Sequence, residues 1–206
     1  MSAGRPLARA GLVMTMVMSF AGCEQGRTEL AADEPSTQTT HVDSVFPIDE
    51  EVRRFRAALD ESVDSLAGGF DSPDSLVAHF MTALEARDAD ALQTMALTPA
   101  EFIDLYYPHT RFTAPPYEMS PGLVWFQLEN YGGKGLNRAL DRFGGRPLGY
   151  VTYACDEEKA EGPNTLLSGC TVSVVGQAAE PHAVSLFGTI IGRDGRWKFV
   201  NYANGL

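Results

Sequence analysis

The chain changes its hydrophobic pattern once, between Phe143 and Pro147. From Ile48 to about Phe143, apolar residues recur every three or four positions, which is the spacing of one face of an α-helix. From Pro147 to Tyr202 they alternate with polar residues or form short runs, as β-strands do. A block of helices followed by a block of strands predicts an α+β fold.

Start and stop signals divide the helical half into segments. A first amphipathic helix is expected over residues 48–71, with Val52, Phe55, Leu59, Val63 and Leu66 on one face and Gly68-Gly69 at its end. Ser72-Pro73, Thr98-Pro99 and Ser120-Pro121 each place an N-cap residue before a proline at the first helical position, and so predict three further helix starts. A short helix is expected over 88–96 and a proline-rich loop over 108–119, and the last helix is expected to be interrupted or bent at Gly132-Gly133.

Four long antiparallel strands are predicted in the second half. They cover residues 148–155, 170–175, 184–191 and 197–202, with Arg193-Asp194-Gly195 as a hairpin turn before the last strand. The polar residues 156–169 are expected to form the loop between the first two strands.

The N-terminus has the three parts of an export signal. Arg5 and Arg9 precede an apolar run over residues 10–21, which is too short to span a bilayer as a helix. The run ends in Ser19-Phe20-Ala21-Gly22-Cys23, which resembles the lipobox of bacterial lipoproteins, with Phe20 where that family usually has Leu. The resemblance implies that residues 1–22 are a signal peptide and that Cys23 is lipidated, and Glu24 implies the outer membrane of a Gram-negative cell envelope. The alternative is a plain secretory signal cleaved near Ala21-Gly22.

Residues 23–47 are predicted to be the lipidated cysteine and a flexible tether. The segment is rich in Thr, Glu, Asp, Ser and Pro and has almost nothing to bury. The whole chain is acidic, with 16 Lys+Arg against 27 Asp+Glu and a net charge of −11. Such a balance argues against nucleic acid as a partner and against attraction to anionic headgroups, so a lipid anchor would have to hold the protein at the membrane.

Cys155 and Cys170 are predicted to form a disulfide. They are the pair that remains once Cys23 is lipidated, and an exported protein folds in an oxidising compartment. Cys155 ends one predicted strand and Cys170 begins the next, so the bond would close the mouth of a hairpin. Two free buried thiols or a metal pair are the alternatives.

The domain from residue 72 to 206 resembles the NTF2-like (SnoaL-like, cystatin-like cone) superfamily. The residues that carry this resemblance are the helical pattern LEARDADAL over 84–92 and DGRWKF over 194–199 before the chain end. It implies N-terminal helices packed on a curved four-stranded antiparallel sheet, with a cavity between the sheet and a helix. It implies no particular activity, because the superfamily contains isomerases, dehydratases, binding modules and structural domains.

The densest group of chemically active residues spans 101–112. Within it, Asp104 and His109 are candidates for an acid–base pair, and Tyr107 and Arg111 for positioning an anion. The structural alternative is that Glu101 caps a helix, Tyr106 lies in the core, and residues 107–109 are a helix exit. No histidine or acid spacing typical of a metal site and no phosphate-binding glycine loop is present, so neither a metal nor a cofactor is expected.

Aromatic residues offer a second candidate site. Trp125, Tyr150 and Tyr153 could line a pocket for an apolar ligand, although aromatic residues at helix and strand spacing are more often plain core.

Three functions are therefore compared. The favoured hypothesis is an envelope lipoprotein whose domain binds a small apolar ligand or another envelope protein without catalysis. The alternatives are a SnoaL-like isomerase or hydrolyase that uses Asp104 and His109, and a purely structural role in envelope assembly.

Overall fold

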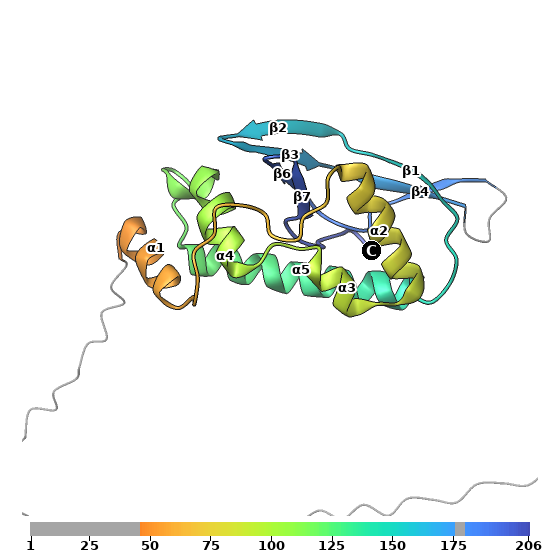
Figure 1. Ribbon diagram of the computed structural model, residues 1–206, viewed down its shortest axis with the longest axis horizontal. Coiled ribbons are helices and arrows are strands. Elements are labelled where there is room, and N and C mark those ends of the chain that lie inside the picture. Colours follow the sequence, from red (N-terminus) through yellow and green to blue (C-terminus); the bar gives the residue numbers. More distant parts are fainter. Residues whose placement is uncertain (1–45, 176–179) are drawn as a thin grey trace, which may run out of the picture. The chain divides into compact units, whose positions relative to one another are not determined.

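A computed structural model describes residues 46–175 and 180–206 (Figure 1). The predicted signal peptide, Cys23 and the tether up to residue 45 lie outside these residues. Residues Ser44–Leu206 form a compact unit of their own. Within the described residues no helix is both long and apolar enough to cross a membrane.

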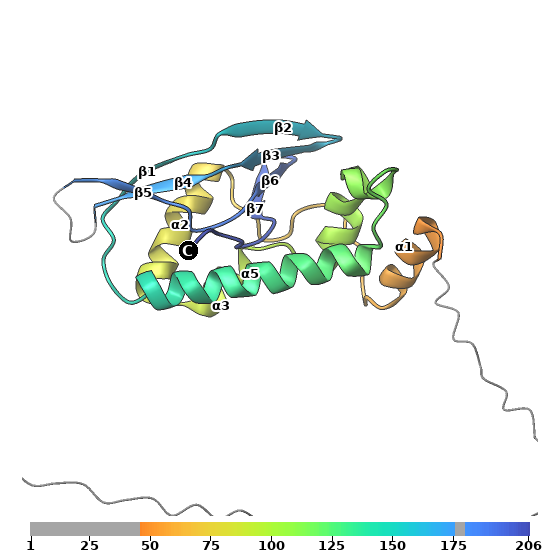
Figure 2. The ribbon, with the colours of Figure 1, turned by 180° about the vertical axis from the view of Figure 1, so that it is seen from behind.

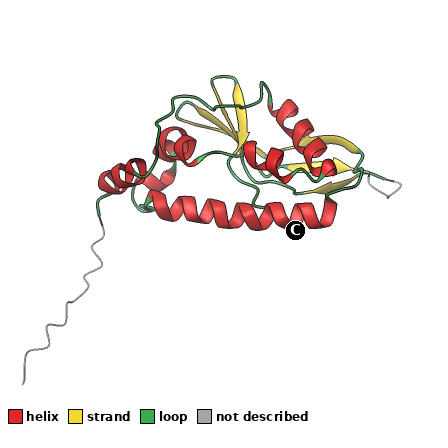
Figure 3. Ribbon diagram, turned by 60° about the horizontal axis from the view of Figure 1, so that its bottom comes forward, coloured by secondary structure: helices red, strands yellow, loops and turns green. Residues whose placement is uncertain are grey.

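Helices come first and strands second, as the hydrophobic pattern predicts. The helices are α1 (Ile48–Ala57), α2 (Pro73–Ala86), α3 (Ala89–Thr94), α4 (Pro99–Glu101), η1 (Phe102–Tyr106), η2 (Tyr107–His109), η3 (Arg111–Thr113) and α5 (Pro121–Phe143). The strands are β1 (Tyr150–Ala154), β2 (Glu157–Glu161), β3 (Asn164–Ser168), β4 (Thr171–Val174), β5 (His182–Val184), β6 (Ile190–Arg193) and β7 (Arg196–Phe199). The helices are not all N-terminal, since α5 ends well past the middle of the chain. It is the longest of the described helices and the long helix of Figure 3.

The strands form two antiparallel sheets, where the sequence predicted one sheet of four. One sheet has the order β1-β4-β5 and the other β2-β3-β6-β7. They are joined through one long hairpin, because β1 leads into β2 and β3 leads back into β4 (Figures 1 and 2). The α+β class is confirmed, and the single four-stranded sheet is wrong.

The predicted loop over residues 156–169 is wrong as well. This segment forms β2 and β3, which pair in register from Glu157 opposite Ser168 to Glu161 opposite Asn164. The sequence EEKAE of β2 has no large apolar residue because the strand lies at the edge of its sheet and is mostly exposed. An edge strand of this kind lacks the alternation by which strands are recognised, and its charges discourage pairing with other chains.

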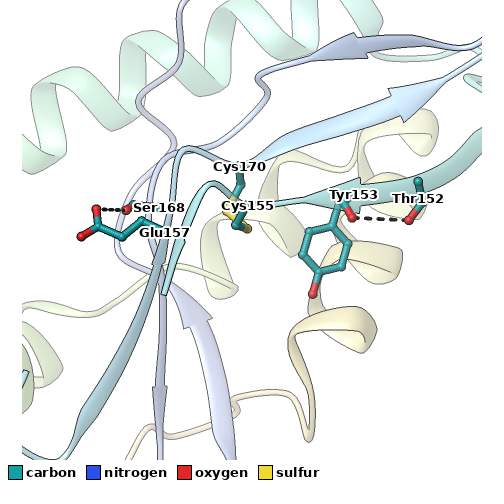
Figure 4. The surroundings of a disulfide bond; sticks show 6 residues. All are labelled: Thr152, Tyr153, Cys155, Glu157, Ser168 and Cys170. Atoms are coloured by element: carbon teal, nitrogen blue, oxygen red, sulfur yellow. Dashed lines mark hydrogen bonds between the residues drawn. A yellow bond between two sulfur atoms is a disulfide. The ribbon is translucent and has the colours of Figure 1, made fainter. Parts of the chain in front are cut away.

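The disulfide between Cys155 and Cys170 is confirmed (Figure 4). It crosses the long hairpin between the β1–β4 pair and the β2–β3 pair, where the two sheets meet. The bond therefore lies at the base of the β2–β3 hairpin, which matches the expected position at a hairpin mouth.

The main core lies between α2, α5 and the strands. Phe80 of α2 contacts Phe187, Phe199 and Tyr202, with ring centres 5.3, 5.4 and 5.7 Å apart. These four rings are almost completely buried. They fill the space between α2 and the strands.

The first helix is shorter than predicted. It ends at Ala57, and residues 58–69 run as irregular chain, although the apolar pattern continues to Leu66. The carboxylate of Asp104 binds this segment, since it accepts hydrogen bonds from the Ser62 hydroxyl at 2.8 Å and from the Val63 N–H at 3.0 Å. Val63 and Leu66 still pack against buried residues, but from irregular chain and not from a helix.

The predicted helix starts are confirmed by their caps. The Ser72 hydroxyl accepts the Ser75 N–H, the Ser120 hydroxyl accepts the Leu123 N–H, and Thr98 and Glu101 form a reciprocal capping box. The region over 108–119 is mostly loop, as expected, but it also contains the end of η2 and the single turn η3.

Helix α5 is continuous, and the interruption expected at Gly132-Gly133 is wrong. The C-terminal segment packs directly on the helix, so that a Cβ on Gly135 would overlap the carbonyl oxygen of Tyr202. The Asn204 side-chain amide also donates to the Gly135 carbonyl at 3.0 Å. The glycines therefore allow a close approach of two segments and do not break the helix.

Candidate functional site

Two hollows of the domain each contain one predicted ligand residue, Trp125 in the first and Arg111 in the second, while Tyr153 lines another hollow beside Asp74. The first, which we call the α5 groove, lies between α5, the segment 93–97 and the C-terminal segment 200–202. The second, which we call the hairpin pocket, lies between residues 106–112 and the β2–β3 hairpin. They differ in chemistry, because the groove is mainly apolar and the pocket mainly polar.

The α5 groove has a volume of about 310 Å³. Its apolar wall consists of Trp125, Leu128, Leu136, Leu97 and Val200, and its polar groups are those of Gln93, Glu129 and Asn201. Gly132 and Gly133 leave one stretch of α5 without side chains, and a Cβ on Gly133 would meet nothing within 4 Å.

Neighbouring contacts hold the groove in shape. The Trp125 ring packs against Phe102, with ring centres 5.1 Å apart. The Tyr202 hydroxyl donates a hydrogen bond to the Leu92 carbonyl, and burial raises the pKa of this phenol. Both aromatic residues are thus fixed by the core and do not have to move to form the groove.

The hairpin pocket has a volume of about 430 Å³. Glu157, Lys159 and Glu161, which alternate along β2, form one wall, and Tyr106, Arg111 and Phe112 form part of the other. Because successive side chains of a strand point to opposite faces, this alternation places all three charged residues of β2 on the same side.

Tyr106 reaches the hairpin pocket from an irregular helical turn. It is the last residue of η1, a π-helix, and π-helical turns occur often at functional sites. The turn leaves the Leu105 carbonyl free to accept hydrogen bonds from the buried Asn164 amide at 2.8 Å and from Arg193 at 3.4 Å. Burial, and then the charge of Glu161, raise the pKa of Tyr106 to about 12, although Arg111 acts in the opposite direction.

Asp104 and His109 are not brought together in either hollow. The Asp104 carboxylate binds Arg56 at 2.7 Å as well as Ser62 and Val63. Burial alone would raise the pKa of Asp104, but these three hydrogen bonds outweigh it and lower the pKa. His109 is exposed, and its ring lies so close to Gly162 of the β2–β3 turn that a Cβ there would overlap it.

Of the other predicted ligand residues, Tyr107 lies apart from Tyr150 and Tyr153. Tyr107 is fully buried, and its hydroxyl donates to the Met119 carbonyl at 2.7 Å, so it belongs to the core. Tyr150 and Tyr153 are half-buried on β1, where a bulge at Val151 shifts the register against β4. Asp74 of α2 faces both phenols, and burial together with this carboxylate raises the pKa of Tyr153 to about 12.

Sequence reasoning missed a buried ion pair. The Lys198 ammonium donates to both carboxylate oxygens of Glu101, at 3.1 and 2.8 Å, and to the Ala67 carbonyl at 3.2 Å. The Lys198 side chain is 3% exposed and the Glu101 side chain 1%. The signal was the position of Lys198 on the same strand face as Val200 and Tyr202, where an apolar residue would be expected.

No metal site is found where the structure describes the chain, since His, Cys, Asp and Glu residues do not gather there in groups of three or more. Comparison with known proteins adds no family, because no protein-family model, no curated sequence and no solved structure matches this chain. The chemistry of the two hollows therefore indicates what the domain can bind.

Proposed function

We propose that this protein is a lipid-anchored lipoprotein of the cell envelope, attached through Cys23 to the outer membrane of a Gram-negative bacterium, whose domain binds a small, largely apolar molecule in the α5 groove. The observation that carries the binding function is the groove itself. Its walls are aromatic and aliphatic and its few polar groups can orient a ligand, which is the usual composition of small-molecule sites.

The size of the groove favours a small molecule over a protein segment. A volume of about 310 Å³ is at the lower end of the range for ligand sites, roughly 300–1,000 Å³. An amphipathic helix would need a continuous groove that accepts side chains over several turns. The glycines of α5 instead leave a short recess that one compact apolar group can fill.

Catalysis has less support than binding. The acid–base alternative requires Asp104 and His109 to reach a common substrate atom. The Asp104 carboxylate is hydrogen-bonded to the segment after α1, whereas the His109 ring of η2 packs against Gly162 of the β2–β3 turn. The envelope-assembly role and a protein partner are decided by the same experiment as the small-molecule function.

The test is binding of the apolar fluorophore N-phenyl-1-naphthylamine to residues 44–206, the compact unit that contains the whole core. The substitution Gly133→Leu fills the groove, because residue 133 lines it and has free space around it. Gly122→Leu is the matched control, since Gly122 lies in the first turn of the same helix, also with open space around it, but outside the groove.

We expect saturable binding by the wild type and by Gly122→Leu, and at least tenfold weaker binding by Gly133→Leu. Equal binding by all three proteins would place the fluorophore elsewhere and refute the groove. An absence of binding by the wild type would leave a protein partner or a structural role as the better function. Circular dichroism spectra of the variants show whether each one is folded.

A further inference from the structure

The hairpin pocket contains polar groups that the domain itself does not use. Arg111 is the clearest of them. Its guanidinium carbon lies 5.4 Å from the centre of the Phe112 ring and 4.9 Å from that of Tyr117. Among the described residues it forms no ion pair, whereas Lys159 in the same pocket is paired with Glu161 at 2.6 Å. A stacked arginine keeps its N–H donors available for a carboxylate, which it can bind through two parallel hydrogen bonds.

Tyr106 adds a second free donor beside Arg111. With its pKa raised to about 12, the phenol is protonated at neutral pH. Its hydroxyl has no hydrogen-bond partner within the described part of the chain, although the residue is half-buried. Its neighbour Leu105 is hydrogen-bonded to Asn164, which pairs with Glu161 across the β2–β3 hairpin, so Tyr106 lies at the Glu161 end of the pocket. The charge of Arg111 acts on the same phenol.

Glu157 provides an acceptor at the other end. Its carboxylate receives one long hydrogen bond, from the Ser168 hydroxyl at 3.3 Å. Glu157 and Glu161 are the first and last residues of β2, so about 13 Å of strand separates them at ~3.3 Å per residue. The pocket therefore has unpaired donors near Glu161 and, at its other end, the Glu157 carboxylate, which can accept further hydrogen bonds.

The charges inside the pocket balance, since Arg111 and Lys159 face Glu157 and Glu161. A ligand with a large net charge of either sign would leave part of this arrangement repelled or unpaired. A zwitterion with separated charges can satisfy both ends at once. Phe112 and Leu166 offer apolar walls for the part of the ligand between its charged ends.

We propose that the hairpin pocket binds a short peptide of two or three residues with free termini, its carboxylate on Arg111 and Tyr106 and its ammonium on Glu157. An extended tripeptide spans about 10 Å at ~3.3 Å per residue, which suits the separation of the two ends. The volume of about 430 Å³ leaves room for small side chains. This site is distinct from the α5 groove in place and in ligand chemistry, so it stands independently of the function proposed there.

The experiment is isothermal titration calorimetry, in which trialanine is added to the full-length chain purified in detergent. N-acetyl-trialanine amide, which lacks both terminal charges, and free alanine are the comparison ligands. We expect trialanine to bind, and the blocked peptide and alanine to bind at least tenfold more weakly. Equal affinity for the blocked peptide would refute recognition of the termini, and equal affinity for alanine would refute the proposed length.

Three variants assign the binding to the pocket. Arg111→Met and Glu157→Gln are each expected to weaken trialanine binding at least tenfold, and Tyr106→Phe to weaken it about threefold. The matched control is Arg146→Met, because Arg146 is also stacked on an aromatic ring, that of Phe143, but lies outside the pocket. Binding that Arg111→Met leaves unchanged, or no heat with the wild type up to 10 mM trialanine, would overturn the proposal.

Discussion

At the scale of single residues, the same side chain can act in catalysis or stabilise the fold, and its hydrogen-bond partners determine which role it has. Asp104 has the features of an acid–base residue in the sequence, since it precedes a histidine, an arginine and two tyrosines. In the structure its oxygens are occupied by one guanidinium, one hydroxyl and one backbone N–H. A carboxylate that is fully hydrogen-bonded in this way holds a segment in place.

Asp104→Asn is therefore expected to destabilise the domain by about 1–3 kcal/mol at neutral pH, since the charge-assisted hydrogen bonds are weakened. The folded-state pKa of Asp104 is lower than its ordinary value, so the carboxylate stabilises the fold above roughly pH 4. That contribution is lost as the pH falls through the folded-state pKa. Urea unfolding at pH 7 and near pH 3 should show a difference between wild type and variant that shrinks in acid.

Asp64→Asn is the control for this comparison, because Asp64 is exposed and, among the described residues, its carboxylate is bound only by its neighbour Ser65. It should change the free energy of unfolding by less than about 0.5 kcal/mol at either pH. A difference between Asp104→Asn and wild type that stays constant from neutral to acid pH would contradict the assigned role of the carboxylate.

Glycines of α5 give a second prediction at this scale. Gly133→Ala adds a Cβ in open space, so it should stabilise the domain by about 0.5–1 kcal/mol through helix propensity. Gly135→Ala adds a Cβ where the Tyr202 carbonyl lies, and should destabilise it by more than about 1 kcal/mol. The two midpoints of urea unfolding should therefore move in opposite directions. A Gly135→Ala protein as stable as wild type would show that the C-terminal segment does not pack on the helix as described.

At the scale of the elements, helix starts that depend on neighbouring residues were predictable from the sequence, whereas features that depend on contacts between distant residues were not. The helix starts at Ser72, Thr98 and Ser120 were predictable because a cap needs only residues three positions apart. The end of α1 was not, because it depends on Asp104, far along the chain. Strand β2 was missed because it is an exposed edge strand. It has charged residues where a strand with one buried face has alternating apolar and polar residues.

The candidate site was predictable only in part. Trp125, Arg111 and Tyr153 line three different hollows. Tyr107 is core, and Asp104 and His109 have separate surroundings. Which of the clustered residues face the same space depends on the π-helix η1 and on the β2–β3 hairpin, and neither follows from local spacing. The NTF2-like resemblance stays a prediction.

The buried ion pair that links α4 to β7 gives a prediction for these elements. Lys198→Met leaves the Glu101 carboxylate buried without its counter-charge, and should destabilise the domain by about 3–5 kcal/mol. Adding Glu101→Gln removes that charge and still leaves an acceptor for the Thr98 N–H, so it should recover a large part of the loss. Chemical denaturation of the single and double variants measures both effects.

Lys134→Met is the matched control, because Lys134 is an exposed lysine on α5, and its effect should be below about 0.5 kcal/mol. If Lys198→Met were equally harmless, or if Glu101→Gln made it worse, the ion pair would not be the link between the two elements.

At the scale of the whole molecule, anchoring and binding are separate tasks of separate parts. The described domain has its own core, its own disulfide and its own hollows. Its acidic character gives it no electrostatic attraction to an anionic membrane surface. In the proposed function, the lipid on Cys23 attaches the protein to the envelope.

Cys23→Ser should consequently release the protein from the membrane without changing the domain. Acyl chains contribute ~0.8 kcal/mol for each buried CH₂, and stable attachment requires more than one chain, so removal of the acceptor thiol removes the whole anchor. We expect the wild type in the membrane fraction with the mass of a lipidated chain that begins at Cys23, and the variant in the soluble fraction with the same thermal unfolding midpoint. Cys155→Ser is the contrasting variant, because it breaks the disulfide and should lower that midpoint while the chain remains in the membrane fraction. A Cys23→Ser protein that has lost residues 1–22 and still sediments with membranes would show that the domain itself binds the envelope.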